Sequence, residues 1–211
     1  MSAAVTSHHH HHAAHAHRHG RADASRRRLA TVTLLTAIYM FAEAVGGWWT
    51  GSLALLADAG HMLADVAALA LALMAVWFGS RPATPGKTFG YHRLEILAAL
   101  INGVVLVLIA LFIFYEAYLR WFAPTPVRSG VMTAVAAGGL AINLICARLL
   151  HSERQDDLNV RGAWLHIMSD ALGSVGAIVA GVIITLTGWY AADALIGMLI
   201  GLHIIWSSWH L

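Results

Sequence analysis

The stretch AWLHIMSDALGSVGAIVAGVIITL, residues 163–186, is an apolar run that carries His166 and Asp170 near its start. A second run, LALLADAGHMLADVAALALALMAVWF at residues 53–78, carries His61 and Asp65 at the same spacing. Each run exceeds the roughly 20 residues that a helix needs to cross the hydrocarbon core of a bilayer. Both stretches therefore predict membrane-spanning helices, in which ionisable side chains are costly and point to a function.

Within each run the histidine precedes the aspartate by four residues. Side chains at this spacing project from one face of a helix, with Cβ atoms about 5–6 Å apart. Two such faces turned toward each other offer two nitrogens and two oxygens, a tetrahedral ligand set for a divalent cation such as zinc. We therefore predict that His61, Asp65, His166 and Asp170 bind a metal ion that the protein transports. A proton relay or a purely structural polar network is the alternative.

The composition indicates an integral membrane protein. Of the 211 residues 59% are hydrophobic and 11% are charged, whereas soluble domains carry about 25% charged residues. The single cysteine, Cys146, excludes an intrachain disulfide and is expected to be a buried thiol. The predicted fold is all-α, a bundle of six transmembrane helices. Six apolar runs predict these helices: Leu29–Trp49, Leu53–Phe78, Leu94–Tyr118, Val131–Leu150, Ala163–Leu186 and Ala191–Trp209.

The basic residues predict the orientation of the bundle. Six spans place both termini on one side, and of the 13 Lys and Arg residues only Arg120 and Arg128 fall on the opposite side. Because cytoplasmic loops are enriched in Lys and Arg, we expect both termini to be cytoplasmic, in a multi-pass protein of a bacterial inner membrane. The basic residues lie between apolar runs, where they face anionic lipid, so no nucleic-acid partner is predicted.

Residues 1–28 form a polar tail ahead of the transmembrane domain, which we assign to residues 29–211. The tail cannot form a core, so we expect it to be disordered and cytoplasmic. It holds His8 to His12 in a row, followed by His15, His17 and His19. Three interpretations stay open, namely a loose metal-capturing tail, an engineered affinity tag and a soluble leader.

Four polar residues inside or beside the spans have structural interpretations. Asn102 and Asn143 are expected to form hydrogen bonds between helices. Asp193 and Glu116 lie near span ends, where water can solvate them.

Two further carboxylates are left with two interpretations each. Asp58 lies three residues before His61 and either lines the mouth of the site or caps the start of its helix. Glu43, in the first span, lies either along the ion path or in a structural pair.

Small residues recur every four positions in both ligand-bearing runs, a spacing that lets membrane helices approach closely. We therefore expect the two helices to pack tightly enough to share one ion. The recurring residues are Ala64, Ala68 and Ala72 in the first run, and Gly173, Ala177 and Gly181 in the second.

Three segments, in this order and at this spacing, resemble the transmembrane part of a cation diffusion facilitator. They are Gly51-Ser-Leu-Ala-Leu-Leu-Ala-Asp-Ala-Gly-His61-x₃-Asp65, Phe89-Gly-Tyr-His-Arg93, and Asn159-Val-Arg-Gly162 leading to His166-x₃-Asp170-Ala-Leu-Gly-Ser174. The resemblance runs from about residue 32 to the end of the sequence. It implies that the four His and Asp residues bind the transported ion, and that zinc or cadmium is preferred over manganese.

The resemblance also carries expectations about partners. Most members continue into a cytoplasmic ferredoxin-like domain that helps them to dimerise, and this sequence lacks it; a naturally short member and a cut chain are both compatible with that. A homodimer is still expected. No resident cofactor is predicted, since the metal is the cargo.

The predicted mechanism is export of the cation from the cytoplasm by proton-coupled antiport with alternating access. Ligands must be deprotonated to bind metal, and imidazole changes its charge between about pH 5 and 8, so metal and protons compete for the same groups. The protein is thus predicted not to be an enzyme. The rivals are a passive metal channel, a metal-sequestering membrane protein and an intramembrane metal-dependent hydrolase. A hydrolase needs an open metal position and a general base, which Asp58 could supply.

Overall fold

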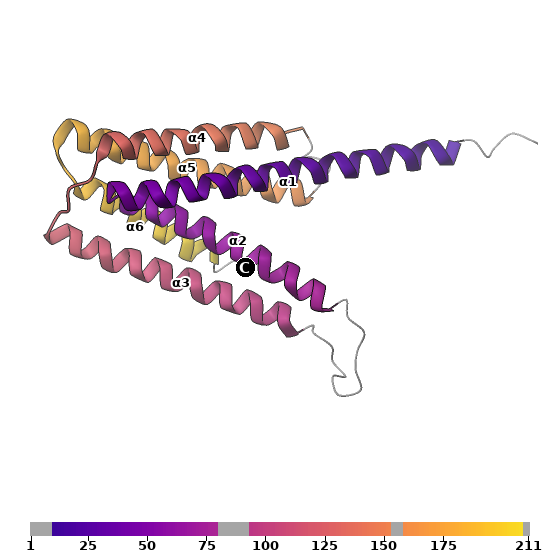
Figure 1. Cartoon of the computed structure of the whole chain (residues 1–211), viewed down its shortest axis with the longest axis horizontal. Coiled ribbons are helices and arrows are strands. Elements are labelled where there is room, and N and C mark those ends of the chain that lie inside the picture. The colour runs from indigo at the N-terminus through magenta and orange to yellow at the C-terminus, as the bar shows by residue number, and fades with distance from the viewer. Residues whose placement is uncertain (1–9, 80–92, 153–157, 209–211) are drawn as a thin grey trace, which may run out of the picture.

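The computed structural model describes residues 10–79, 93–152 and 158–208, and all the regular elements in these ranges are helices. Apart from the start of the first helix, the bounds agree with the predicted runs within a few residues, which confirms the helical membrane bundle. Figure 1 shows how the helices of the described residues are arranged. They are α1 (His10–Thr50), α2 (Leu53–Gly79), α3 (Arg93–Phe122), α4 (Ser129–Leu150), α5 (Leu158–Thr187) and α6 (Ala191–Ser208).

The first helix begins earlier than the sequence predicts. Residues 10–28 continue α1 as helix, where we expected disorder, and residues 1–9 lie outside the described residues. The tail is rich in Ala and Arg, which are strong helix formers. Because it extends a helix that already exists, it avoids the cost of a new helical nucleus. Figure 1 shows this part of α1 projecting beyond the other helices.

Membrane-spanning character is found in most of these helices. Among the described residues four segments are long and apolar enough to cross a bilayer, and Ala191–Trp206 is a shorter apolar helix. Large apolar side chains point outward from them, for example Leu172 and Leu186, which are 72% and 79% exposed. Such a surface suits lipid rather than water. The four segments are Arg27–Thr50, Leu100–Phe122, Ser129–Leu150 and Val160–Thr187.

Helix α2 lies at the centre of the bundle, in contact with α1, α3, α5 and α6. Helix α5 packs chiefly against α4, and it touches α2 over only a short stretch. In Figure 1, α2 and α3 diverge from α4 and α5 toward the end of the bundle at which α2 ends and α5 begins. The two helices that carry the H-x₃-D pairs therefore belong to separate packing groups. One group is α2 with α3 and α6, and the other is α5 with α4.

Tight turns join the helices at the opposite end. Gly51 between α1 and α2, and Gly188 between α5 and α6, have φ values of 74° and 71°. Glycine reaches this left-handed region without a steric cost, which explains the short connections.

The start of α2 is held by a carboxylate from α6. Asp193 is 1% exposed, and it accepts hydrogen bonds from the Ser52 hydroxyl at 2.6 Å and from the backbone N–H groups of Leu53 at 2.6 Å and Ala54 at 3.2 Å. Arg120 of α3 lies 3.6 Å from the same carboxylate. The expectation that water solvates Asp193 is therefore wrong, because the residue caps another helix.

One glycine of the predicted ridge on α5 lies close to α2. A Cβ atom added at Gly173 would lie 3.1 Å from an Asp58 carboxylate oxygen, so this glycine does face α2. Gly181 instead faces Thr133 of α4. The two glycines of the α5 ridge thus face different neighbours, and the contact with α2 lies at Gly173.

Candidate metal site

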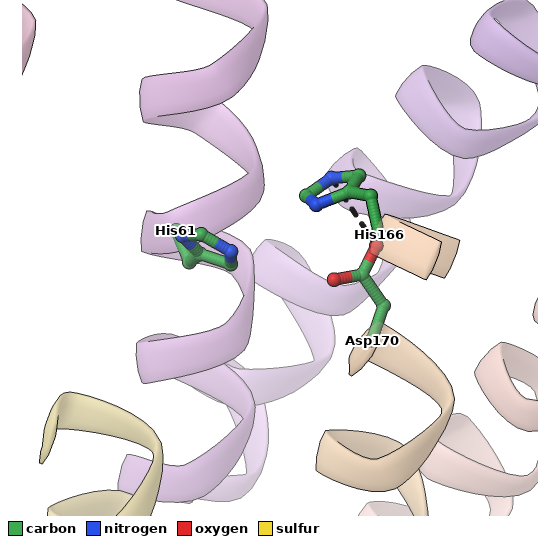
Figure 2. A group of neighbouring side chains, drawn as sticks. All are labelled: His61, His166 and Asp170. Atoms are coloured by element: carbon green, nitrogen blue, oxygen red, sulfur yellow. Dashed lines mark ion pairs between the residues drawn. The ribbon is translucent and has the colours of Figure 1, made fainter. Parts of the chain in front are cut away.

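Figure 2 shows His61 of α2 opposite His166 and Asp170 of α5. One potential ligand atom from each of these three residues lies within 4.8 Å of the others. The two imidazole rings have centroids 5.7 Å apart and meet edge to face. Two separate spans therefore direct nitrogen and oxygen ligands to one point, as the H-x₃-D spacing predicts.

Asp65 completes the group from the α2 side. Its Oδ2 lies 3.5 Å from Nε2 of His61 and 3.3 Å from Nε2 of His166. Asp170 Oδ2 lies 3.5 Å from the same nitrogen of His166. The structure thus brings all four predicted residues together, and we call them the central cluster. Their role as metal ligands stays a prediction.

Several polar atoms of the central cluster are buried without a hydrogen-bond partner among the described residues. They are Nδ1 of His61, Oδ2 of Asp65 and Oδ2 of Asp170. The contacts between imidazole and carboxylate become ion pairs only when the imidazoles are protonated. A buried carboxylate left without a partner is costly. Either a cation or protons on the histidines would remove that cost.

Two cavities reach the central cluster from different sides. One, of about 180 Å³, lies between α1, α2 and α5, and its lining includes Asp65 and His166. The other, of about 210 Å³, lies between α2, α5 and α6, and its lining includes His61 and Asp170. Each cavity thus exposes one ligand from α2 and one from α5. An ion in the cluster would lie between the two spaces.

Asp58 and Glu43 form a second buried acidic pair beside the cluster. Glu43 is 0% and Asp58 5% exposed, and the two carboxyl groups interact electrostatically with each other and with Asp170. Neither oxygen of Glu43 has a hydrogen-bond partner among the described residues. Asp58 also lines the cavity of α2, α5 and α6. Since Ser52 and Asp193 cap α2, the geometry supports the interpretation that Asp58 lines the mouth of the site.

One residue near the cluster was missed by the sequence analysis. His203 of α6 lines the same cavity as His61 and Asp170. Its Nε2 lies 2.6 Å from the Ser169 hydroxyl, and its ring centroid is 6.5 Å from that of His61. A search for paired ligands at i and i+4 cannot find it. The available signal is a single histidine in the middle of an apolar run.

Comparison with known proteins identifies the family. Residues 29–211 match the model of the cation efflux transmembrane domain. The chain belongs to this family. The resemblance inferred from the three sequence segments is therefore confirmed.

Three relatives are similar over most of this chain. It is 48% identical over 203 residues to the zinc transporter ZitB of Escherichia coli, a match that covers 94% of this chain and 65% of the relative. It is 47% identical over 193 residues to the metal cation efflux system protein CzcD of Cupriavidus metallidurans, covering 92% and 61%. It is 42% identical over 197 residues to a cadmium, cobalt and zinc/H⁺–K⁺ antiporter of Bacillus velezensis, covering 92% and 63%. The chain thus spans less than two thirds of the length of these relatives.

Proposed function

We propose that this protein exports divalent transition-metal cations, zinc first and cadmium next, from the cytoplasm in exchange for protons. The observation that carries the proposal is the central cluster itself, in which two spans place two imidazoles and two carboxylates between two cavities. This ligand set suits zinc and cadmium better than magnesium or manganese. The relatives, which are named for zinc, cadmium and cobalt, support the same cargo.

Proton coupling follows from the chemistry of the ligands. The charge of the two aspartates is balanced either by one divalent cation or by protons on the histidines, and the two occupants exclude each other. Exchange of one occupant for the other keeps buried charge compensated throughout the cycle. The short contact between α2 and α5 supports alternating access, because few contacts must break for the two packing groups to move.

The rival functions fit the geometry less well. Four ligands fill a tetrahedral metal, whereas a hydrolase keeps one position open for water. A channel would need no exchange of protons for metal. We therefore favour a secondary transporter, located in the cytoplasmic membrane with both termini inside and assembled as a homodimer.

The test is zinc flux into proteoliposomes with and without an imposed pH gradient, for the wild type beside Asp170→Ala. The matched control is Glu116→Gln, which removes a carboxylate that pairs with Arg120 at 3.0 Å, away from the cluster. Flux that depends on the gradient, persists in the control and is lost in Asp170→Ala is the expected result. Flux indifferent to the gradient would favour a channel, and metal binding without flux would favour a sequestering protein. Unchanged flux in Asp170→Ala would overturn the site.

A further inference from the structure

His203 is the one residue of α6 with a strong metal-ligating group in the lining of the cavity between α2, α5 and α6. The same lining holds His61 and Asp170, one ligand from each half of the central cluster. Helix α6 supplies none of the four cluster residues. A third helix therefore presents an imidazole to the space through which an ion would enter or leave the cluster.

The ring distances place His203 just outside the cluster. Two imidazoles that share a tetrahedral zinc, with bonds of about 2.0–2.1 Å, have ring centroids about 5–6 Å apart. The His61 and His166 rings meet this condition at 5.7 Å, whereas His61 and His203 are 6.5 Å apart. His203 therefore does not share an ion with His61 in this arrangement, but a small displacement of the ion or of α6 brings it within reach.

A hydrogen bond holds the His203 ring. The Ser169 hydroxyl, on α5 next to Asp170, lies 2.6 Å from Nε2 of His203. When Nε2 carries the proton and donates it to Ser169, Nδ1 keeps its lone pair for a metal. Orientation of a ligating histidine through its other nitrogen is the usual arrangement around protein metal sites. The Trp206 ring lies nearby on the same helix, with ring centroids 6.1 Å apart.

We propose that His203 is a transfer ligand for the transported cation. A divalent cation leaving or entering the central cluster through this cavity binds the His203 imidazole while His61 or Asp170 still holds it. Exchange of one ligand at a time avoids a step in which a bare ion crosses an apolar space. This inference rests on the proposed export function and adds a residue to its ion path.

The alternative is a purely structural role, in which His203 only links α6 to α5 through its hydrogen bond with Ser169. The two roles respond differently to substitution. His203→Gln keeps a side chain that can bond Ser169 but removes the imidazole. Ser169→Ala removes the hydrogen bond but keeps the imidazole. His203→Cys replaces one metal ligand by a softer one that favours cadmium over zinc.

The experiment measures initial rates of zinc and cadmium flux for the full chain in proteoliposomes, beside equilibrium zinc affinity in detergent. His203→Gln is expected to slow zinc flux by at least about tenfold, while the zinc affinity of the cluster changes by less than about threefold. His203→Cys is expected to restore cadmium flux more than zinc flux. The matched control is His151→Gln, an exposed histidine at the end of α4 that contacts Trp164 instead, and it should transport at the wild-type rate.

The outcomes separate this inference from the function on which it rests. If the wild type transports, Asp170→Ala does not, and His203→Gln keeps the wild-type rate, then only the transfer role is overturned. Slow flux in Ser169→Ala with normal flux in His203→Gln would likewise show a structural link alone. If the wild type shows no flux driven by the gradient, the proposed function fails, and the inference fails with it. Should His203→Gln not fold, His203→Cys provides the test. If its preference between zinc and cadmium is the same as that of the wild type, the transfer role of His203 is overturned.

Discussion

Two buried polar clusters in this molecule differ in how well their atoms are paired. The first, which we call the cap cluster, consists of Asp193, Ser52 and Arg120 at the start of α2. Asp193 accepts three hydrogen bonds and lies beside the Arg120 guanidinium. Arg120 in turn donates to the backbone carbonyl of Gly51 at 2.5 Å and to Glu116 at 3.0 Å. The cap cluster has its hydrogen-bonding partners within the protein.

The central cluster has the opposite character. Asp170 is 3% exposed and His61 7%, yet each keeps an atom without a hydrogen-bond partner among the described residues. Natural proteins pair nearly all buried polar atoms, so we expect the unpaired atoms of the central cluster to meet an occupant other than protein. The comparison teaches that burial of a carboxylate does not reveal its role, whereas the state of its partners does.

The largest effect is expected from Asp170→Asn, which keeps the shape of the side chain and removes its charge. Zinc affinity should fall by more than about 100-fold, in line with the roughly 3–5 kcal/mol lost when one partner of a buried charge pair is removed. Without metal, the stability of the bundle should be unchanged or higher, since an unpaired buried charge has gone. Competition with a chromophoric chelator measures the affinity and thermal unfolding in detergent measures the stability. A variant that is destabilised but keeps its zinc affinity would show that Asp170 has a structural role.

Metal itself should stabilise the protein through the central cluster alone. Zinc at 100 times its dissociation constant should raise the free energy of unfolding by about 2.7 kcal/mol. Asp170→Asn should lose this increment, whereas a variant of the cap cluster such as Asp193→Asn should keep it. The unfolding midpoint with zinc and with a chelator gives the increment for each protein. An increment that depends on Asp193 and not on Asp170 would reverse our assignment of the two clusters.

Asp193→Ala should show the reverse pattern, with lost stability and retained affinity. Removing the cap of α2 and the partner of Arg120 should cost about 2 kcal/mol, a value at the upper end for a helix cap. The fraction that stays folded should bind zinc as tightly as the wild type, because the polar partners of Asp193 are Ser52, the start of α2 and Arg120 rather than the central cluster. The measurements are the same two, unfolding and chelator competition. A loss of affinity without a loss of stability would contradict the structural role.

The sequence predicts the bundle and the central cluster well for identifiable reasons. Apolar runs of the right length report membrane helices directly. The i, i+4 spacing of His61 and Asp65 is repeated at His166 and Asp170. It places each pair on one face of its helix, whichever way the helices pack. Both features are properties of one short stretch, and no knowledge of the neighbours is needed to read them.

What the sequence analysis missed depends on contacts between distant segments. Asp193 caps a helix that begins about 140 residues earlier in the chain, so its position near a span end could only suggest solvation. The position of His203 beside the cluster is apparent only from the cavity that α6 shares with α2 and α5. The helix at residues 10–28 differs from the expected disorder for another reason, because the helix propensity of its Ala and Arg residues acts locally and does not depend on forming a core.

The smallest effects are expected from two buried serines, one in each region. Ser52 donates to Asp193 at 2.6 Å and accepts from the Leu55 N–H at 3.2 Å, so Ser52→Ala should cost about 1 kcal/mol of stability. Ser174, 1% exposed and one turn from Asp170, has no hydrogen-bond partner for its hydroxyl among the described residues. Ser174→Ala should therefore change stability by less than about 0.5 kcal/mol, since the hydroxyl gains nothing from the protein. Thermal unfolding without metal compares the two variants directly. If Ser174→Ala instead weakens zinc binding while stability holds, the Ser174 hydroxyl takes part in the zinc site. The central cluster then extends one helical turn farther along α5.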